Sequence, residues 1–503
     1  MSQSETRRLP AEIAWHRLVP SWPLLLGLLA FRRLLAERMS LLNDPDTYLH
    51  IAAGQWILAH GALPRHDPFS HSLPGASWIA SEWLAEIAFA AIYDQAGWGG
   101  VILLAAACVA IAVGLLTHFL LRHLEPLPAL IAAVAGAALL LPHVLARPHV
   151  LALPLLVLWA GSLFAARDAA QDANRGPPFA ALPVMVLWAN IHGSFMFGLA
   201  LAAFVAAEAV LWPAAGRSRR AEASRWGLFV LAALVCALLT PFGLAGFEQP
   251  FRLLQMPALQ ATFAEWISPD FQKSPALEVW LLGALLVGYA SGARLPLPRL
   301  VLLLGLVHMA LQHGRHGDLL ALVAPLAVAA PLGRSLAVLT AGQAPSRLGR
   351  WLARLAQPAG IAAAALTLLV AAAFALPTAL RPIGRGDDAV TPGAALAAAT
   401  RLGLSGPVFN SEGFGGYLMF RGIPSFIDGR IEMYGNDFLA QDFRAERGNE
   451  AVLTELLARY RIGWTLFVPN AGAVLVMDHL AGWQRVYADD WAVVHRRIAA
   501  ESR

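Results

Sequence analysis

The chain has 503 residues, of which 58% are hydrophobic and only 14% are charged, and its formal net charge is +4 at pH 7. In soluble globular proteins about a quarter of the residues are charged. A soluble fold with as few charged residues as this chain could not cover so large an apolar core. These values exclude an ordinary soluble protein and predict a polytopic α-helical membrane protein.

The N-terminal segment 1–17 is basic, with Arg7, Arg8 and Arg17, which favours a cytoplasmic N-terminus. The first apolar segment, 18–38, lacks a small-residue cleavage site and therefore resembles a retained signal anchor. Its Arg32 and Arg33 fit either snorkelling to the membrane surface or contact with an anionic ligand.

A long polar stretch, 39–80, follows the first span and begins the segment 39–96. That segment contains two helical segments, 46–60 and 82–95, which we expect to lie on the membrane surface as parts of a first outer loop. The second is too short and too acidic to cross a bilayer. If it does not cross, the arginine-rich loops further along the chain all fall on one side, as the positive-inside rule requires.

Ten more apolar segments follow, so we predict about eleven spans. The further spans lie at 97–121, 126–142, 148–166, 178–190, 194–213, 226–241, 277–291, 298–313, 318–333 and 358–379. This arrangement places 39–96, 143–149, 190–194, 242–276, 314–317 and everything after about 380 on the outer side.

From about residue 380 the composition changes to a mixture of charged residues, glycines and short apolar runs. We therefore expect a transmembrane domain over 1–380 and a small soluble α/β domain over 381–503. In the second domain, strands are predicted at 408–409, 417–420, 425–427, 465–468 and 491–495, and one or two helices within 436–460.

Asp44, Asp46 and His50 come directly after the first span, although each of them opposes membrane insertion. They predict an active site at the membrane surface in which a carboxylate acts as general base. One of the carboxylates also fits an N-cap of the helix 46–60, which does not exclude catalysis. We expect no required cofactor, but the Asp44–Asp46 spacing leaves a divalent cation open.

Polar side chains recur at the outer ends of later segments. Arg147 and Arg315 run against the positive-inside bias, and a guanidinium fork matches the geometry of phosphate. Histidines there can donate to phosphate or to sugar hydroxyls. We expect the following residues to bind substrate: His50, Asp67, Glu82, Arg147, His149, Asn190, His192, Glu265, Arg315, His316, Asp428 and Arg430.

Simpler interpretations of some of these residues remain open. His149 and His192 fit ordinary loop positions, and Asp67 fits a turn with the following Pro68. Asp428 and Arg430 fit an internal salt bridge of the C-terminal domain.

The order of these features resembles the GT-C fold of integral-membrane glycosyltransferases. The motifs that carry the resemblance are Asp44-Pro-Asp46-Thr-Tyr-Leu-His50 with Gly54, His66-Asp67-Pro-Phe-Ser70, Glu82-Trp83, Arg147-Pro-His149, Asn190-Ile-His192-Gly193, Arg315-His316 and Ile427-Asp428-Gly-Arg430. In that fold the catalytic carboxylate lies in the first outer loop, and the donors are polyprenyl-phosphate-linked sugars.

The resemblance implies an inverting transfer of a hexosyl or pentosyl group, with Asp44 or Asp46 as base and Arg147 and Arg315 on the phosphate. The implied partners are the polyprenyl-phosphate sugar, the membrane, and a glycan, lipid or protein acceptor, with no nucleic acid. The implied location is the bacterial cytoplasmic membrane, with the C-terminal domain in the periplasm. The alternatives are a lipid or polysaccharide transporter, which would place polar groups near the midplane, and a non-catalytic assembly factor of envelope glycan synthesis.

Overall fold

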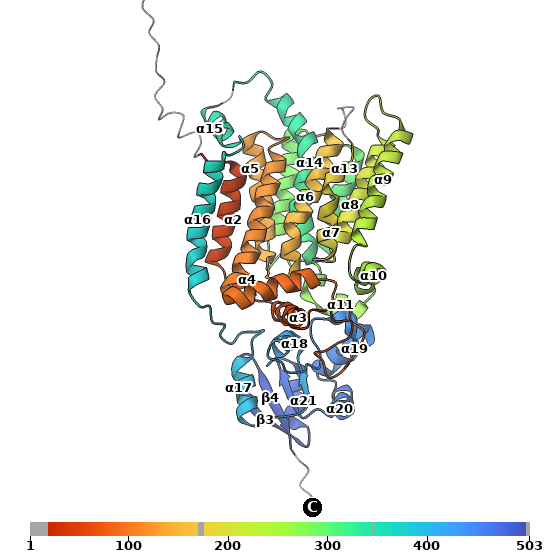
Figure 1. The fold of residues 1–503 in the computed structure, drawn as a ribbon, viewed down its shortest axis with the longest axis vertical. Coiled ribbons are helices and arrows are strands. Elements are labelled where there is room, and N and C mark those ends of the chain that lie inside the picture. Colours follow the sequence, from red (N-terminus) through yellow and green to blue (C-terminus); the bar gives the residue numbers. More distant parts are fainter. Residues whose placement is uncertain (1–18, 170–175, 345, 499–503) are drawn as a thin grey trace, which may run out of the picture.

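The computed structural model describes residues 19–169, 176–344 and 346–498, which form a helical bundle with a smaller α/β part at one end (Figure 1). The basic N-terminal segment 1–17 lies outside the described residues. The bundle helices are α2 (Trp22–Ala36), α4 (Trp83–Leu120), α5 (Pro126–Leu140), α6 (Pro148–Asp168), α7 (Leu182–Ala189), α8 (Phe195–Leu211), α9 (Arg219–Ala237), α12 (Ala276–Ser291), α13 (Leu297–Gln312), α14 (Gly317–Leu339) and α16 (Ile361–Leu380).

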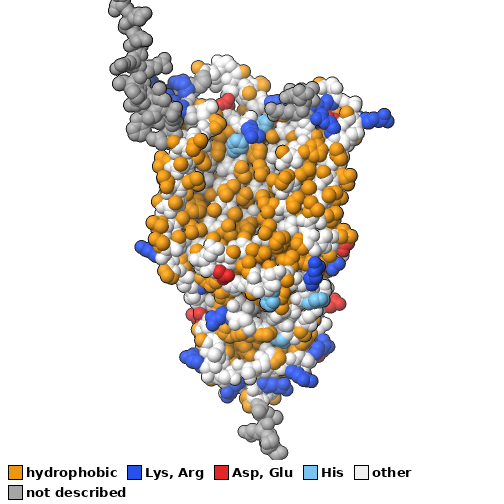
Figure 2. Space-filling model, in the orientation of Figure 1, with side chains coloured by type: hydrophobic (Ala, Val, Ile, Leu, Met, Phe, Trp, Pro, Cys, Tyr) orange, Lys and Arg blue, Asp and Glu red, His pale blue; other side chains and the backbone are white. Residues whose placement is uncertain are grey.

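Each of the eleven predicted spans coincides with one of these helices. In the described residues, five helical segments are both long enough and apolar enough to cross a membrane: Trp83–Leu120, Pro126–His143, Pro148–Asp168, Gly314–Leu339 and Ile361–Leu380. The number of eleven spans therefore stays a prediction. Hydrophobic side chains cover the middle of the bundle, whereas charged side chains gather towards its ends (Figure 2). This distribution is the one expected of a protein surrounded by lipid.

The predicted surface helices are present. Helix α3 (Asp46–His60) and the first half of α4 lie across the end of the bundle that faces the α/β part (Figure 1). Helix α4 changes direction at Gly97, whose φ of 57° is in the left-handed region that favours glycine. The two helices touch at Gly54, where a side-chain carbon would overlap with the backbone oxygen of Glu86.

The C-terminal α/β part contains one four-stranded sheet in the order β1-β2-β4-β3, in which β1 and β2 are parallel and the other pairs antiparallel. Its elements are α17 (Gly393–Arg401), β1 (Val408–Asn410), α18 (Glu412–Phe420), α19 (Ile431–Glu446), α20 (Glu450–Arg459), β2 (Trp464–Phe467), α21 (Gly472–His479), β3 (Trp483–Ala488) and β4 (Val493–Arg497). Phe409, Phe426 and Phe467 form the centre of its core.

Two predicted strands of this part are wrong. Residues 417–420 belong to helix α18, and 425–427 stay outside the sheet. The backbone of Ser425 pairs instead with the first polar loop, accepting from the N–H of His71 (3.0 Å) and donating to the carbonyl of Phe69 (3.2 Å). A short extended segment such as 425–427 looks the same in sequence whether its partner is a sheet or a distant loop. Strand β3 and helix α21 had no predicted counterpart.

Helix α18 packs directly on α3, which places the α/β part over the start of that helix. At Gly416 of α18, a side-chain carbon would overlap with the backbone oxygen of Pro45. Tyr48 of α3 stacks edge-to-face with Tyr417 (ring centroids 5.1 Å apart), and its hydroxyl is 2.9 Å from Oγ1 of Thr391. The first residues of α3 are therefore held between the bundle and the α/β part.

Candidate active site

The acidic motif occupies the start of α3. One oxygen of Asp44, Oδ1, accepts a hydrogen bond from the backbone N–H of Asp46 (2.8 Å), so Asp44 satisfies a donor at the helix start. The hydroxyl of Thr47 donates to the backbone oxygen of Ala146 (3.1 Å). This bond ties α3 to the turn that precedes α6 and brings the adjacent Arg147 to the two carboxylates.

Arg147 is the centre of an ionic cluster that joins four segments of the chain. Its Nη1 lies 3.2 Å from Asp44 Oδ2 and 3.2 Å from Glu265 Oε2, and its Nη2 lies 2.7 Å from Asp46 Oδ2. The other oxygen of Glu265 is 3.3 Å from Nη1 of Arg315, whose guanidinium lies over the ring of Trp266. Glu265 thus forms a bridge between the two arginines, in the position that a phosphate group would suit.

The surroundings shift the pKa values of two carboxyl groups of this cluster in opposite directions. Burial raises the pKa of Asp46 to about 7, because it outweighs the opposing charge of Arg147 and is helped by the negative charge of Asp44. Burial alone would also raise the pKa of Glu265, but Arg147 and Arg315 together hold it below its usual value. Asp46 is therefore suited to accept a proton near neutral pH, whereas Glu265 stays ionised.

A second polar group lies further along α3. His50 is placed between two carboxyl groups, with Nε2 3.8 Å from Glu82 Oε2 and Nδ1 3.7 Å from Glu86 Oε1. His192, from the turn between α7 and α8, has its Nε2 3.6 Å from Glu82 Oε1. Glu86 was not among the predicted site residues. The sequence could have indicated Glu86, because it follows Glu82 by four residues on a predicted surface helix. This spacing puts both side chains on one face of the helix.

The remaining predicted site residues of the bundle are His149, Asn190 and His316. The His149 ring centroid is 6.3 Å from that of His192, so it borders the second group. Asn190 instead links helices, since it accepts from Trp83 Nε1 (2.9 Å) and donates to the backbone oxygen of Leu239 (3.0 Å). His316 is paired with the backbone oxygen of Met309 (3.3 Å).

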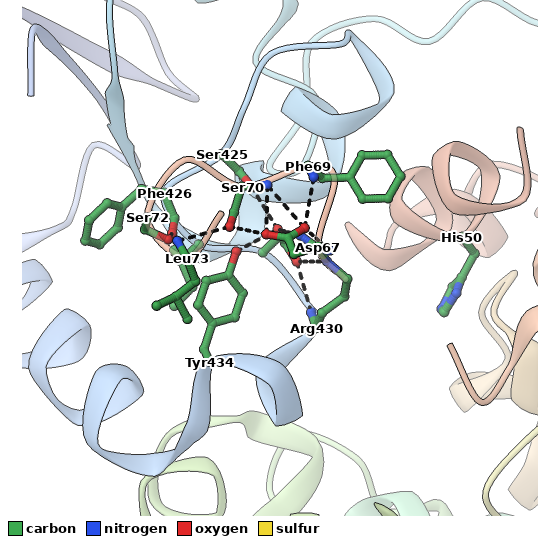
Figure 3. A network of polar contacts seen from close by, with 12 residues as sticks. His50, Asp67, Phe69, Ser70, Ser72, Leu73, Ser425, Phe426, Arg430 and Tyr434 are labelled. Carbon is green, nitrogen blue, oxygen red and sulfur yellow. Dashed lines mark hydrogen bonds and ion pairs between the residues drawn. The ribbon is translucent and has the colours of Figure 1, made fainter. Parts of the chain in front are cut away.

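Asp67, Asp428 and Arg430 form a buried ionic network (Figure 3). Arg430 donates from Nε to Asp428 Oδ1 (2.7 Å), from Nη2 to Asp428 Oδ2 (2.7 Å) and from Nη1 to Asp67 Oδ1 (2.5 Å). Tyr434 and Ser425 also donate to Asp428 Oδ2, each at 2.8 Å. Burial alone would raise the pKa of Asp428, but Arg430 and these donors hold it below its usual value.

The internal salt bridge considered for Asp428 and Arg430 is therefore present, and Asp67 of the first polar loop completes it. Asp67 also accepts from the backbone N–H of Phe69 (2.9 Å), as the turn interpretation requires. These three side chains form ion pairs through Arg430 and thereby join the α/β part to the loop that follows α3.

The described residues contain no group of three or more His, Cys, Asp or Glu side chains arranged to hold a metal ion. One oxygen of Asp44 and one of Asp46 are each paired with Arg147.

No protein-family model matches the chain, and no curated protein matches its sequence. Its structure is similar to that of the archaeal oligosaccharyltransferase AglB from Archaeoglobus fulgidus in complex with an inhibitory peptide and a dolichol-phosphate (TM-score 0.56, 12% identity, covering 98% of this chain and 75% of that one). It is also similar to ArnT from Cupriavidus metallidurans bound to undecaprenyl phosphate (TM-score 0.50, 14% identity, covering 97% and 98%). The predicted resemblance is thus confirmed at the level of architecture: the chain has the GT-C fold of integral-membrane glycosyltransferases.

Proposed function

We propose that this protein is a membrane glycosyltransferase that moves a sugar from a polyprenyl-phosphate donor to an acceptor hydroxyl, with inversion at the anomeric carbon. The observation that carries the proposal is the pairing of Asp46, whose side chain is 17% exposed, with Arg147, which the shared carboxylate of Glu265 links to Arg315 at the polar end of a lipid-embedded bundle. This combination supplies a base and an anion-binding site next to each other.

Arg147 and Arg315 would hold the phosphate of the donor. The two guanidinium groups share one carboxylate, that of Glu265, and an incoming phosphate would take its place between them. The solved structures with this fold include complexes with dolichol-phosphate and undecaprenyl phosphate, which supports a phosphorylated polyprenyl lipid as the ligand.

An apolar groove of about 620 Å³ lies beside the start of α4 and suits a lipid chain. Trp83, Leu187 and Leu239 are among the residues that line it. Trp83 directly follows Glu82 in sequence, and its ring nitrogen donates to Asn190, which also borders the groove. A polyprenyl chain in the groove would bring its phosphate end towards the polar residues.

Asp46 would act as the base and Asp44 would position it. Asp44 already accepts a backbone hydrogen bond and pairs with Arg147, whereas the high pKa of Asp46 suits proton transfer. Asp46 takes the hydroxyl proton of the acceptor while the acceptor oxygen forms a bond to the anomeric carbon. The bond from that carbon to the phosphate oxygen breaks, and its electron pair leaves with the phosphate. Because phosphate is a good leaving group, the step needs no second, protonating carboxyl group of the kind that glycosidases use.

The setting that fits this reaction is the outer face of the bacterial cytoplasmic membrane, with the α/β part in the periplasm. The acceptor would approach from the side of that part, which lies over Asp46. A glycan, a lipid or a protein could supply the hydroxyl.

Transfer from radiolabelled undecaprenyl-phosphate sugars by the purified protein in lipid tests the proposal. We expect Asp46→Asn to lower the rate at least about a hundredfold, because it removes the general base. Asp94→Asn is a matched control on the neighbouring surface helix α4, where Asp94 is exposed and accepts a hydrogen bond from Gln55. Equal transfer by wild type and Asp46→Asn would contradict the proposed base, and no transfer from any donor would contradict the proposed activity.

A further inference from the structure

The second polar group consists of His50, Glu82, Glu86 and His192, and the distances between these side chains are too long for hydrogen bonds among them. Three approaches, His50 to Glu82, His50 to Glu86 and His192 to Glu82, measure 3.8, 3.7 and 3.6 Å. Each is longer than an ordinary hydrogen bond between nitrogen and oxygen. The side chains face one another and yet do not complete one another's hydrogen bonds.

Two atoms of the group are buried without a hydrogen-bond partner: Nδ1 of His50 and Oε2 of Glu86. His50 is 8% exposed and Glu86 is 3% exposed. A buried polar atom without a partner costs free energy, and a ligand that pairs with it removes that cost. The carboxyl group of Glu86 can accept hydrogen bonds, and His50 can supply either a donor or an acceptor.

The structure fixes the protonation of His192. Its Nδ1 accepts from the backbone N–H of Ser194 (3.2 Å) and lies 2.7 Å from the hydroxyl of that residue. That hydroxyl in turn accepts from the ring nitrogen of Trp188 (2.9 Å), which leaves its hydrogen for His192. Burial holds the pKa of His192 well below its usual value. His192 is therefore a neutral imidazole that carries its hydrogen on Nε2, directed at Glu82.

The group is held rigidly at a defined place relative to the proposed base. His50 follows Asp46 by four residues, so the two lie on one face of α3, about 6 Å apart along its axis. The close approach of Gly54 to the backbone of Glu86 fixes how the two surface helices cross. A sugar whose anomeric carbon reacts beside Asp46 would extend its ring towards these residues.

Charge limits what can bind there. Glu82 and Glu86 contribute carboxyl groups, and Glu432 of the α/β part acts electrostatically on both. Burial raises the pKa of Glu82 and of Glu432 to about 7 and that of Glu86 to about 8, although Arg147 and Arg430 oppose these shifts, so the site disfavours negative charge. A further carboxylate would be repelled, whereas groups that donate hydrogen bonds would be held.

We propose that His50, Glu82, Glu86 and His192 form the subsite for the transferred sugar, and that it selects a sugar with hydroxyl or amino donors and rejects an acidic sugar. The inference rests on the proposed function, because it takes the sugar to be joined to a phosphate held by Arg147. Both neutral sugars and amino sugars carry hydrogen-bond donors of the kind that the subsite requires. Binding measurements show which of the two classes it prefers.

The test measures dissociation constants of the full-length protein in lipid nanodiscs for four ligands. These are undecaprenyl phosphate and its glucosyl, amino-sugar and glucuronosyl esters. Wild type is compared with Glu82→Gln and His192→Gln. Glu248→Gln is the control, since Glu248 is exposed and pairs only with the neighbouring Arg252.

We expect the glucosyl or the amino-sugar ester to bind wild type more tightly than undecaprenyl phosphate does, and the glucuronosyl ester to bind no more tightly. Glu82→Gln and His192→Gln should weaken the preferred ester about tenfold and leave undecaprenyl phosphate unchanged. The unchanged ligand also shows that each variant is folded.

The outcomes separate this inference from the proposed function. If the preferred ester keeps its advantage in both variants, or if the glucuronosyl ester binds best, the subsite is wrong while the lipid-phosphate site stands. If wild type binds none of the four ligands, the proposed donor class fails, and the subsite fails with it.

Discussion

Gly429 of the α/β part lies directly against Asp46 of the first polar loop. A side-chain carbon at position 429 would overlap with Oδ1 of Asp46. On either side of Gly429, Asp428 and Arg430 bind each other, and Arg430 also donates to Asp67. The buried network thus holds a segment of backbone in contact with the carboxyl group that we propose as the base.

Gly429→Ala should therefore displace the carboxyl group of Asp46 and lower the rate of sugar transfer by more than about tenfold, as small misplacements of catalytic groups do. The measurement is kcat for transfer, together with the unfolding temperature to show that the fold is retained. Gly413→Ala is the matched control, because a side-chain carbon there meets no atom within 4 Å. A normal kcat for Gly429→Ala would show that the contact does not position Asp46.

The pH dependence of transfer should follow the ionisation of Asp46. A general base acts only when it is deprotonated, and burial raises the pKa of Asp46 to about 7. We expect kcat/KM to rise about tenfold per pH unit below that value and to level off above it. Asp44→Asn should move the rise to lower pH, because the negative charge of Asp44 contributes to the high pKa. A profile that is flat from pH 5.5 to pH 9 would contradict the assignment, and Asp94→Asn should leave the profile unchanged.

Asp428→Asn should destabilise the protein by roughly 3–5 kcal/mol, because it leaves the buried guanidinium of Arg430 without its main partner. The loss is measurable by chemical unfolding in detergent, with Tyr434 and Ser425 also losing their acceptor. Glu455→Gln is a suitable control, since its pair with Arg459 is exposed and joins neighbouring turns of one helix. A small effect of Asp428→Asn would show that the network is not essential to the joint between the two parts.

Glu265→Gln should increase the affinity for undecaprenyl phosphate several-fold. The carboxylate of Glu265 pairs with Arg147 and Arg315 and so competes with a phosphate for both. Removing its charge removes the competitor and leaves both guanidinium groups in place. Titration of undecaprenyl phosphate into the protein in nanodiscs measures the change, with Glu248→Gln as control. Weaker binding would instead indicate that Glu265 orients the arginines for the ligand.

Much of the architecture was predictable because it depends on local properties of the chain. Apolar segments of membrane-spanning composition marked the bundle helices, and the acidic stretch 82–95 marked the surface half of α4. Arginines that run against the positive-inside bias drew attention to Arg147 and Arg315, which the structure brings to the same carboxylate. The residue types at the helix ends were enough to indicate which segments meet.

The roles of individual side chains were less predictable because they depend on contacts between distant segments. Arg430 and Asp67 are 363 residues apart in sequence, and only their contact shows that both are engaged in joining two parts of the protein. Asn190 likewise pairs with Trp83, 107 residues away in sequence. Glu86 was missed because an acidic residue on a surface helix normally faces water.

The sequence by itself determined that this is a multi-helix protein for a lipid environment, with an acidic motif at the start of a surface helix, because hydrophobic length and charge act on each segment separately. Only the tertiary structure decided which groups surround Asp46, and our choice of Asp46 over Asp44 as the proposed base rests on them. That choice depends on burial, on the arginine from the turn before α6 and on the glycine from the α/β part, and these come together only when the chain has folded.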